Sequence, residues 1–108
     1  MLLSNNRRQI EPSAQEDGIH NYYEKLVIEQ IIRSDDRAKS DPDFLSDVAC
    51  LALNKLPPRY VRHDVDMTFY LTPDEMENMI DRVAIAVNEA VAYIDEKARE
   101  IGLEPIEN

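Results

Sequence analysis

The sequence predicts a small, mainly α-helical single domain with three main helices and one short extended segment. Its 108 residues are enough for one domain with one core, and an apolar fraction of 44% is ordinary for a globular protein. Only two glycines provide for tight turns, which favours helices. Three stretches also carry apolar residues at three- and four-residue intervals, the spacing of one buried helical face.

Changes in composition divide the chain into an arm, a domain and a tail. Residues 1–13 are polar and show no periodicity, so we expect a flexible N-terminal arm. Residues 14–103 form the predicted domain, and residues 104–108 form a short acidic tail. The chain shows neither a signal-peptide core nor the roughly 18 uninterrupted apolar residues of a membrane span. We therefore expect a soluble cytoplasmic protein with no membrane partner.

The first predicted helix lies in the stretch from residue 19 to residue 32. A charged run at residues 34–40, SDDRAKS, follows it without apolar anchors and predicts a loop. The two adjacent tyrosines of the helix are expected to pack in the core or an interface rather than to stack on bases. The apolar stripe consists of Ile19, Tyr22, Tyr23, Leu26, Val27, Ile31 and Ile32.

The second predicted helix begins after Asp41, an N-cap residue followed by Pro42 at the first helical position. It ends by Leu56, because the two prolines that follow disfavour helical geometry. Cys50 lies among small apolar neighbours and is expected to be buried. As the single cysteine it makes no internal disulfide and holds no zinc by itself. The buried stripe consists of Phe44, Leu45, Val48, Ala49, Ala52 and Leu56.

The third predicted helix is long. Thr72, Pro73 and Glu75 supply an N-cap, a first-turn proline and the third position of a capping box, and Gly102 marks the end. Alanines on more than one face predict that this helix packs on two sides, against its own chain and a second copy. The periodic positions are Met76, Met79, Ile80, Val83, Ala86, Val87, Ala90 and Ile94.

The segment from residue 61 to residue 71 alternates apolar and polar residues, which is the period of a strand. In the extended form one face carries Arg62, Asp64 and Asp66 in sequence. Val61, Val65 and Phe69 are also spaced four residues apart, so a helix stays open, although we expect an extended segment. A lone strand needs a partner, and the same segment of a second copy, paired antiparallel across a two-fold axis, supplies one. A homodimer is therefore expected.

The charges and the residue types exclude several classes of function. A net charge of −10 argues against binding long DNA or RNA, which needs clustered Lys and Arg. No nucleophile elbow, glycine-rich phosphate loop or zinc pattern is present, so we expect no enzyme, no cofactor and no catalytic residue. His63, Asp64 and Asp66 come nearest to a metal set, but His63 and Asp64 point to opposite faces of a strand, and no metal is expected.

The segment around residues 59–66 instead carries the groups that read a guanine nucleotide. An arginine matches phosphate oxygens or guanine O6 and N7, a carboxylate accepts hydrogen bonds from guanine N1 and N2, and a tyrosine stacks on a base. In the competing interpretation, the arginines only form surface salt bridges with the aspartates. The candidate binding residues are Arg59, Tyr60, Arg62, His63, Asp64 and Asp66.

The run DFLSDVACLALNKLPPRYVRHDVDMTFYLTPDE resembles the signature of the late competence protein ComFB family, and the resemblance covers residues 21–93. The resemblance implies a small, mainly helical, dimeric cytoplasmic protein. It also implies a receptor for cyclic di-GMP, and in some members for cyclic di-AMP, that acts through a downstream regulatory protein on cell size, competence or pilus-related processes. Some relatives carry additional cysteines that could hold zinc, which this chain lacks. The alternative is a protein–protein adaptor in competence or pilus regulation, or a receptor for cyclic di-AMP.

Overall fold

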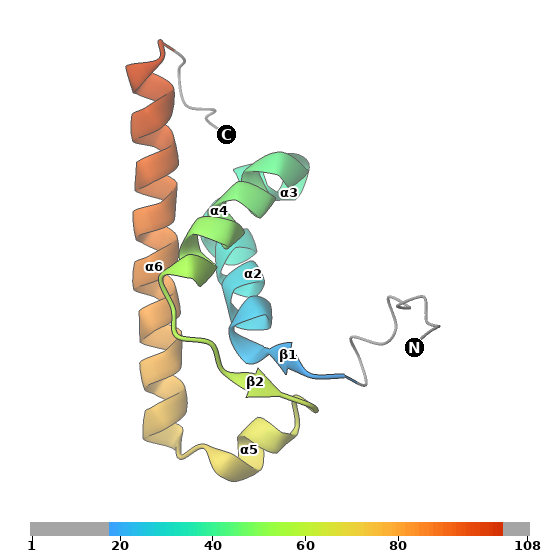
Figure 1. Ribbon diagram of the computed structural model, residues 1–108. Helices are drawn as coiled ribbons and strands as arrows, with labels where there is room; N and C mark the ends of the chain where they lie inside the picture. Colours follow the sequence, from blue (N-terminus) through green and yellow to red (C-terminus); the bar gives the residue numbers. More distant parts are fainter. Residues whose placement is uncertain (1–17, 103–108) are drawn as a thin grey trace, which may run out of the picture.

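The computed structural model describes residues 18–102 and confirms a mainly helical fold with a small two-stranded sheet (Figure 1). The predicted arm at residues 1–13 and the tail at 104–108 lie outside the described residues. In chain order the elements are β1 (His20–Asn21), α2 (Tyr22–Ser34), α3 (Arg37–Ser40), α4 (Pro42–Asn54), β2 (Tyr60–Val61), α5 (Asp66–Tyr70) and α6 (Pro73–Glu100).

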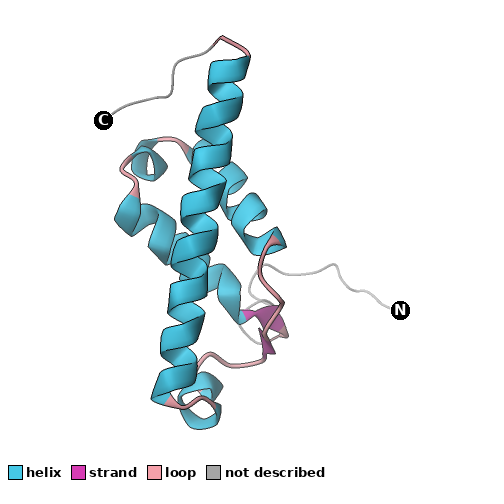
Figure 2. Cartoon of the chain, turned by 90° about the vertical axis from the view of Figure 1, so that its left-hand side faces the viewer, coloured by secondary structure: helices cyan, strands magenta, loops and turns pink. Residues whose placement is uncertain are grey.

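The core lies where α2, α4 and α6 pack against one another. Helix α6 runs the full height of the molecule, and Figure 2 shows α2 and α4 crossing behind it. The predicted stripes supply the core, but three of their residues are exposed. Ile19 precedes the first helix and is 77% exposed, and Ile32 and Ile80 are 38% and 45% exposed. The most deeply buried side chains are Val27, Ile31, Val48, Ala52, Met67, Val83, Val87 and Ala90.

The predicted helix starts and stops are confirmed at α4 and α6. The Asp41 side chain accepts a hydrogen bond from the Phe44 amide at 3.0 Å, so it caps α4. Thr72 and Glu75 form a reciprocal capping box ahead of α6. Gly102 follows α6 with a φ of 85°, a left-handed conformation that glycine adopts without steric cost.

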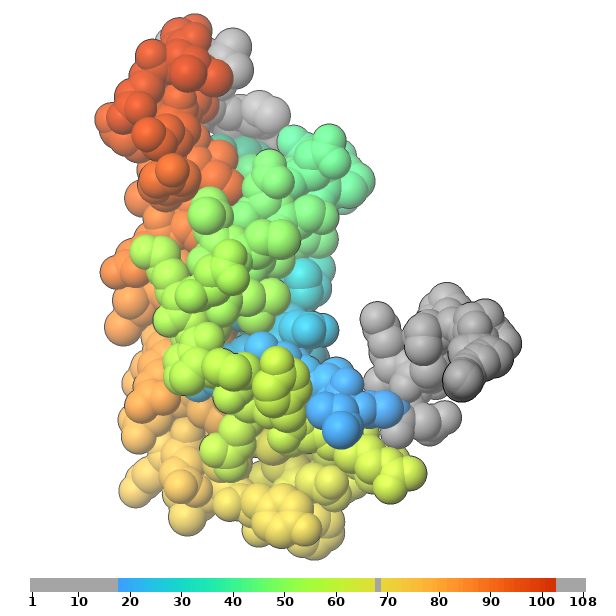
Figure 3. All heavy atoms as spheres, in the orientation of Figure 1, coloured from blue at the N-terminus to red at the C-terminus, as the bar shows by residue number. Residues whose placement is uncertain are grey.

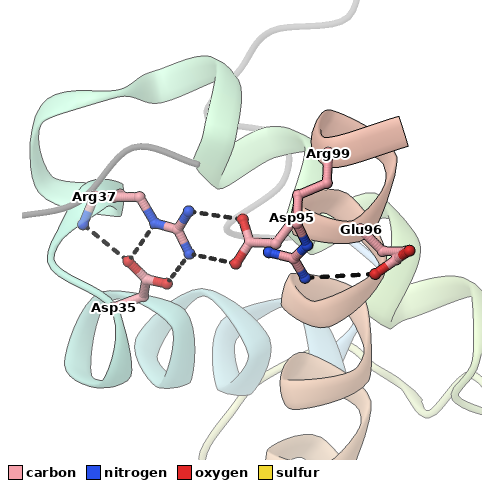
Figure 4. Close-up of polar contacts among 5 residues, drawn as sticks. All are labelled: Asp35, Arg37, Asp95, Glu96 and Arg99. Atoms are coloured by element: carbon pink, nitrogen blue, oxygen red, sulfur yellow. Dashed lines mark hydrogen bonds and ion pairs between the residues drawn. The ribbon is translucent and has the colours of Figure 1, made fainter. Parts of the chain in front are cut away.

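The loop predicted at residues 34–40 is confirmed only at residues 35 and 36, because Ser34 ends α2 and residues 37–40 form the single helical turn α3. Its anchor is Arg37, a charged residue that is only 8% exposed. The Arg37 guanidinium donates to Asp35 and to Asp95 of α6 (Figure 4). It also lies 4.3 Å from the centroid of the Phe44 ring. The buried Arg37 pairs and the small side chain of Ala38, at 6% exposure, therefore anchor a turn that has no large apolar residue.

The strand predicted over residues 61–71 is also wrong beyond Val61, since residues 66–70 form helix α5. Met67 points into the core, at 2% exposure, while Phe69 is 78% exposed. A strand would have placed these two residues on the same face, so the apolar–polar alternation does not describe this segment. The strand that does form pairs within the same chain: β2 runs antiparallel to β1, with Asn21 opposite Tyr60. The sheet therefore needs no second copy, and the homodimer stays a prediction that rests on other features.

Cys50 is exposed, contrary to the prediction that it is buried. Consecutive residues of a helix are about 100° apart, so Cys50 is turned roughly 200° from both Val48 and Ala52. Those two residues are fully buried, which leaves Cys50 on the solvent side of α4.

Candidate functional site

The segment at residues 57–65 runs along the surface beside β1 and joins α4 to α5, as the space-filling view shows (Figure 3). Asn21 fixes it in place. The Asn21 Oδ1 atom accepts from the Tyr23 amide at 3.1 Å, which caps α2, and from the Arg59 amide at 2.9 Å. The Tyr22 amide in turn donates to the Arg59 carbonyl at 2.6 Å. The backbone of Arg59 is thus bound to the start of a core helix.

One open groove, with a volume of about 790 Å³, lies between this segment and α2. It brings together three of the predicted site residues, Tyr60, His63 and Asp64. His20 and Lys25 also line it, and the sequence interpretation missed both. No local signal marks them, because each lies about forty residues from the segment that it faces. The apolar wall of this groove consists of Ile19, Ile28 and Val65.

A charged cluster joins the two sides of this groove. His20 Nε2 lies 2.7 Å from Asp64 Oδ1, and Lys25 Nζ lies 3.5 Å from Asp64 Oδ2. The hydrogen bond to the Asp64 carboxylate raises the pKa of His20 above the usual 6.5. The same bond to His20, with a smaller effect of Lys25, lowers the pKa of Asp64 below 3.8. Both carboxylate oxygens of Asp64 therefore have partners within the chain.

We expect the His20–Asp64 pair to stabilise the fold most between about pH 4 and 6.5. Because the pKa of His20 is raised in the folded protein, the pair adds to the free energy of unfolding. This addition is complete below pH 6.5 and is lost as the pH rises through the folded-state pKa. The lowered pKa of Asp64 makes a second addition to the free energy of unfolding, which is complete above pH 3.8 and is lost as the pH falls through the folded-state pKa. Because the Asp64 side chain is 41% exposed, the effect should stay within about 1 kcal/mol.

Two measurements check this expectation. Urea unfolding across pH should show the largest difference between the unaltered protein and Asp64→Asn near pH 5, and NMR titration of the His20 ring should give a pKa above 6.5 that falls in the variant. A His20 pKa that is equal in the two proteins would contradict it.

A second, smaller groove of about 290 Å³ lies on the other side of the segment, against α6. Of the predicted residues it contains Arg59. Arg82 of α6 also lines it, as do Glu75 and Asn78 from the same helix and the buried Tyr23. The sequence interpretation did not select Arg82, which had only its position on the polar side of a long helix to mark it.

The structure thus separates the six predicted residues. Arg62 and Asp66 line neither of these two grooves, and Asp66 begins α5 with its amide bonded to the His63 carbonyl. The single polar face expected from an extended segment therefore does not form. The salt-bridge interpretation also fails for Arg59: Asp64 pairs with His20 and Lys25, and the Arg59 guanidinium makes no ion pair among residues 18–102.

Two further properties concern the described part of the chain. Between residues 18 and 102, His, Cys, Asp and Glu side chains do not gather in groups of three that would suit a metal ion. No helix in this range combines the length and the apolar character needed to cross a membrane; even the 28-residue α6 carries charges throughout.

The family model for the late competence development protein ComFB matches residues 20–98, which include β1, β2 and the residues that line both grooves from His20 onward. The chain belongs to the ComFB family. Membership of the ComFB family supports a role related to competence. No curated protein and no solved structure matches the chain.

Proposed function

We propose that the protein is a non-enzymatic receptor that binds cyclic di-GMP at the surface segment of residues 57–65. The observation that carries the proposal is the state of this segment. Arg59, Tyr60 and His63 are exposed, the Arg59 backbone is hydrogen-bonded to Asn21 and Tyr22, and Tyr60 pairs with Asn21 in the sheet. Groups held on a fixed backbone lose little entropy when a ligand binds, which favours recognition.

The two grooves carry side chains that can bind different groups of a cyclic dinucleotide. The Arg59 groove supplies guanidinium groups for phosphate or for guanine O6 and N7, and the Glu75 carboxylate is an acceptor for guanine N1 and N2. The other groove supplies Tyr60, a residue that is 65% exposed and whose ring is available for stacking. These groups support guanine as the base.

Calorimetric titration with cyclic di-GMP tests the proposal. We expect saturable binding, and Arg59→Ala should weaken it by roughly ten- to a hundredfold, the worth of a charge-assisted hydrogen bond. Arg33→Ala is the control, because Arg33 is exposed on α2, contacts Gln30 and changes the net charge equally. The melting temperature of each variant should stay near that of the unaltered protein. Absence of heat with cyclic di-GMP would reject the receptor function.

The base preference is tested by competition. Cyclic di-AMP should displace labelled cyclic di-GMP only at large excess, because a carboxylate meets no donor on the adenine N1 edge. Asn78 lines the Arg59 groove, and an amide pairs well with adenine N6 and N7, so it favours the alternative of a cyclic di-AMP receptor. Equal affinities would mean that the site reads phosphate and ring shape alone.

A second candidate function, a protein–protein adaptor in competence or pilus regulation, is favoured by the exposed aromatic side chains of α5. Phe69 and Tyr70 are 78% and 74% exposed, and neighbouring exposed aromatic residues are common at protein interfaces. The two functions are compatible if the nucleotide controls binding of the downstream partner, which would act on cell size, competence or pilus-related processes.

A further inference from the structure

The arginines of the smaller groove differ from the other cationic side chains of the described chain. Between residues 18 and 102 each other lysine or arginine has a partner, in most cases a nearby carboxylate, and Arg62 is engaged as well. The guanidinium groups of Arg59 and Arg82 have none within this range, although the protein carries a net charge of −10. Both arginines line the same groove.

Two rigid elements hold this pair. On one side Glu75, Asn78, Met79 and Arg82 follow the three- and four-residue spacing of one face of α6. On the other side a Pro-Pro dipeptide precedes Arg59, whose amide and carbonyl are both hydrogen-bonded to the start of α2. Arg59 and Arg82 therefore project from backbones that are already fixed.

The carboxylate in this groove does not neutralise the arginines. Glu75 Oε1 accepts from the Thr72 amide at 2.8 Å, which completes the cap of α6, and Glu75 makes no ion pair with a residue of the described range. The groove carries an excess of one positive charge. Like charges that share a groove repel each other, so an anion between them gains from both.

We propose that Arg59 and Arg82 together bind a phosphate group of a small phosphate ester in the groove between residues 57–59 and α6. Arginine suits this task because its planar fork donates two parallel hydrogen bonds to phosphate oxygens. The volume of about 290 Å³ accommodates a phosphate and an adjoining sugar or base edge, so the rest of the ligand extends out of the groove. The inference rests on the proposed function and deepens it, since it assigns one phosphate of cyclic di-GMP to this pair.

Titration of three variants with cyclic di-GMP tests the assignment. Arg59→Gln and Arg82→Gln should each lower the affinity about tenfold or more, the loss expected for a charge-assisted hydrogen bond. Arg99→Gln is the control: it lies on the same helix, is exposed, pairs with Glu96 and changes the net charge equally (Figure 4). Its affinity should match that of the unaltered protein. If the unaltered protein binds and Arg82→Gln binds equally well, the proposal is overturned while the receptor function stands.

A second probe keeps the test decisive if cyclic di-GMP does not bind at all. Inorganic pyrophosphate, added at millimolar concentration, should then shift the NMR signals of the Nε–H groups of both arginines in the unaltered protein. Replacing either arginine with Gln should abolish the shift of the other. Signals that stay in place in the unaltered protein would overturn the phosphate site independently of the cyclic dinucleotide.

Discussion

Replacing Arg37 with Ala should destabilise the protein by about 3–5 kcal/mol, the usual cost of breaking a buried ion pair by removing one partner. Arg37 donates to Asp35 at 2.7 Å and to Asp95 at 2.8 Å, and these side chains are between 10% and 22% exposed. The variant would leave two carboxylates without their cation and would remove the stacking on Phe44. Thermal unfolding followed by circular dichroism should show a melting temperature lower by more than about 10 °C.

The matched control for Arg37 is Lys39→Ala in the same helical turn. Lys39 pairs with Asp36, but both side chains are more than 60% exposed, and such pairs are worth at most about 1 kcal/mol. Arg37→Lys should restore little, because an ammonium group cannot form the two parallel hydrogen bonds that the guanidinium makes with each of the two carboxylates. Equal losses for Arg37→Ala and Lys39→Ala would mean that the buried pair contributes nothing to stability.

Placing a carboxylate on the buried side of α5 should have an effect of similar size. Met67 is 2% exposed, so Met67→Asp buries an unpaired charge and should cost several kcal/mol. Phe69 is 78% exposed, and Phe69→Asp should change the stability of a single chain by less than about 0.5 kcal/mol. Urea unfolding of the two variants measures the difference. Equal losses at low protein concentration would show that the burial of α5 is misassigned.

The same two variants test the predicted homodimer. Light scattering at micromolar concentration should give about twice the chain mass of 12.5 kDa. If the exposed face with Val65, Phe69 and Tyr70 forms the dimer interface, Phe69→Asp should give monomers. The loss of unfolding free energy that this variant causes should then grow with protein concentration. The cost of Met67→Asp should not depend on concentration. A monomeric mass for the unaltered protein would contradict the predicted homodimer.

The features that the sequence predicted correctly depend on residues close together in the chain. Asp41 ahead of Pro42, and Thr72 with Pro73 and Glu75, satisfy the free amides of a helix start whatever else the chain does. The stripes of α4 and α6 follow from helical geometry alone. The same geometry predicts that Cys50 faces solvent, so that error was avoidable from the sequence.

The remaining errors concern pairs of residues far apart in the chain. Burial of Arg37 depends on Asp95, 58 positions later, and the groove cluster depends on His20 meeting Asp64 across 44 positions. In the segment of residues 61–71, the apolar residues fit both the period of a strand and the spacing of a helix. Only the contact of Met67 with the core favours helix α5 over a strand. Of the six predicted site residues, the sequence placed all on one segment, but it could not show that Arg59 faces one groove and Tyr60 the other.

The double role of Asn21 has a consequence for the dynamics of the binding segment. One carbonyl oxygen closes the first turn of α2 and also holds the Arg59 amide, 38 positions away. A rotation of the Asn21 side chain breaks both bonds, so in that event the amides of Tyr23 and Arg59 lose their protection against hydrogen exchange together. A ligand that holds Arg59 and Asn21 in place would disfavour this rotation, so its binding should also slow hydrogen exchange at the start of α2, a helix that the ligand need not touch.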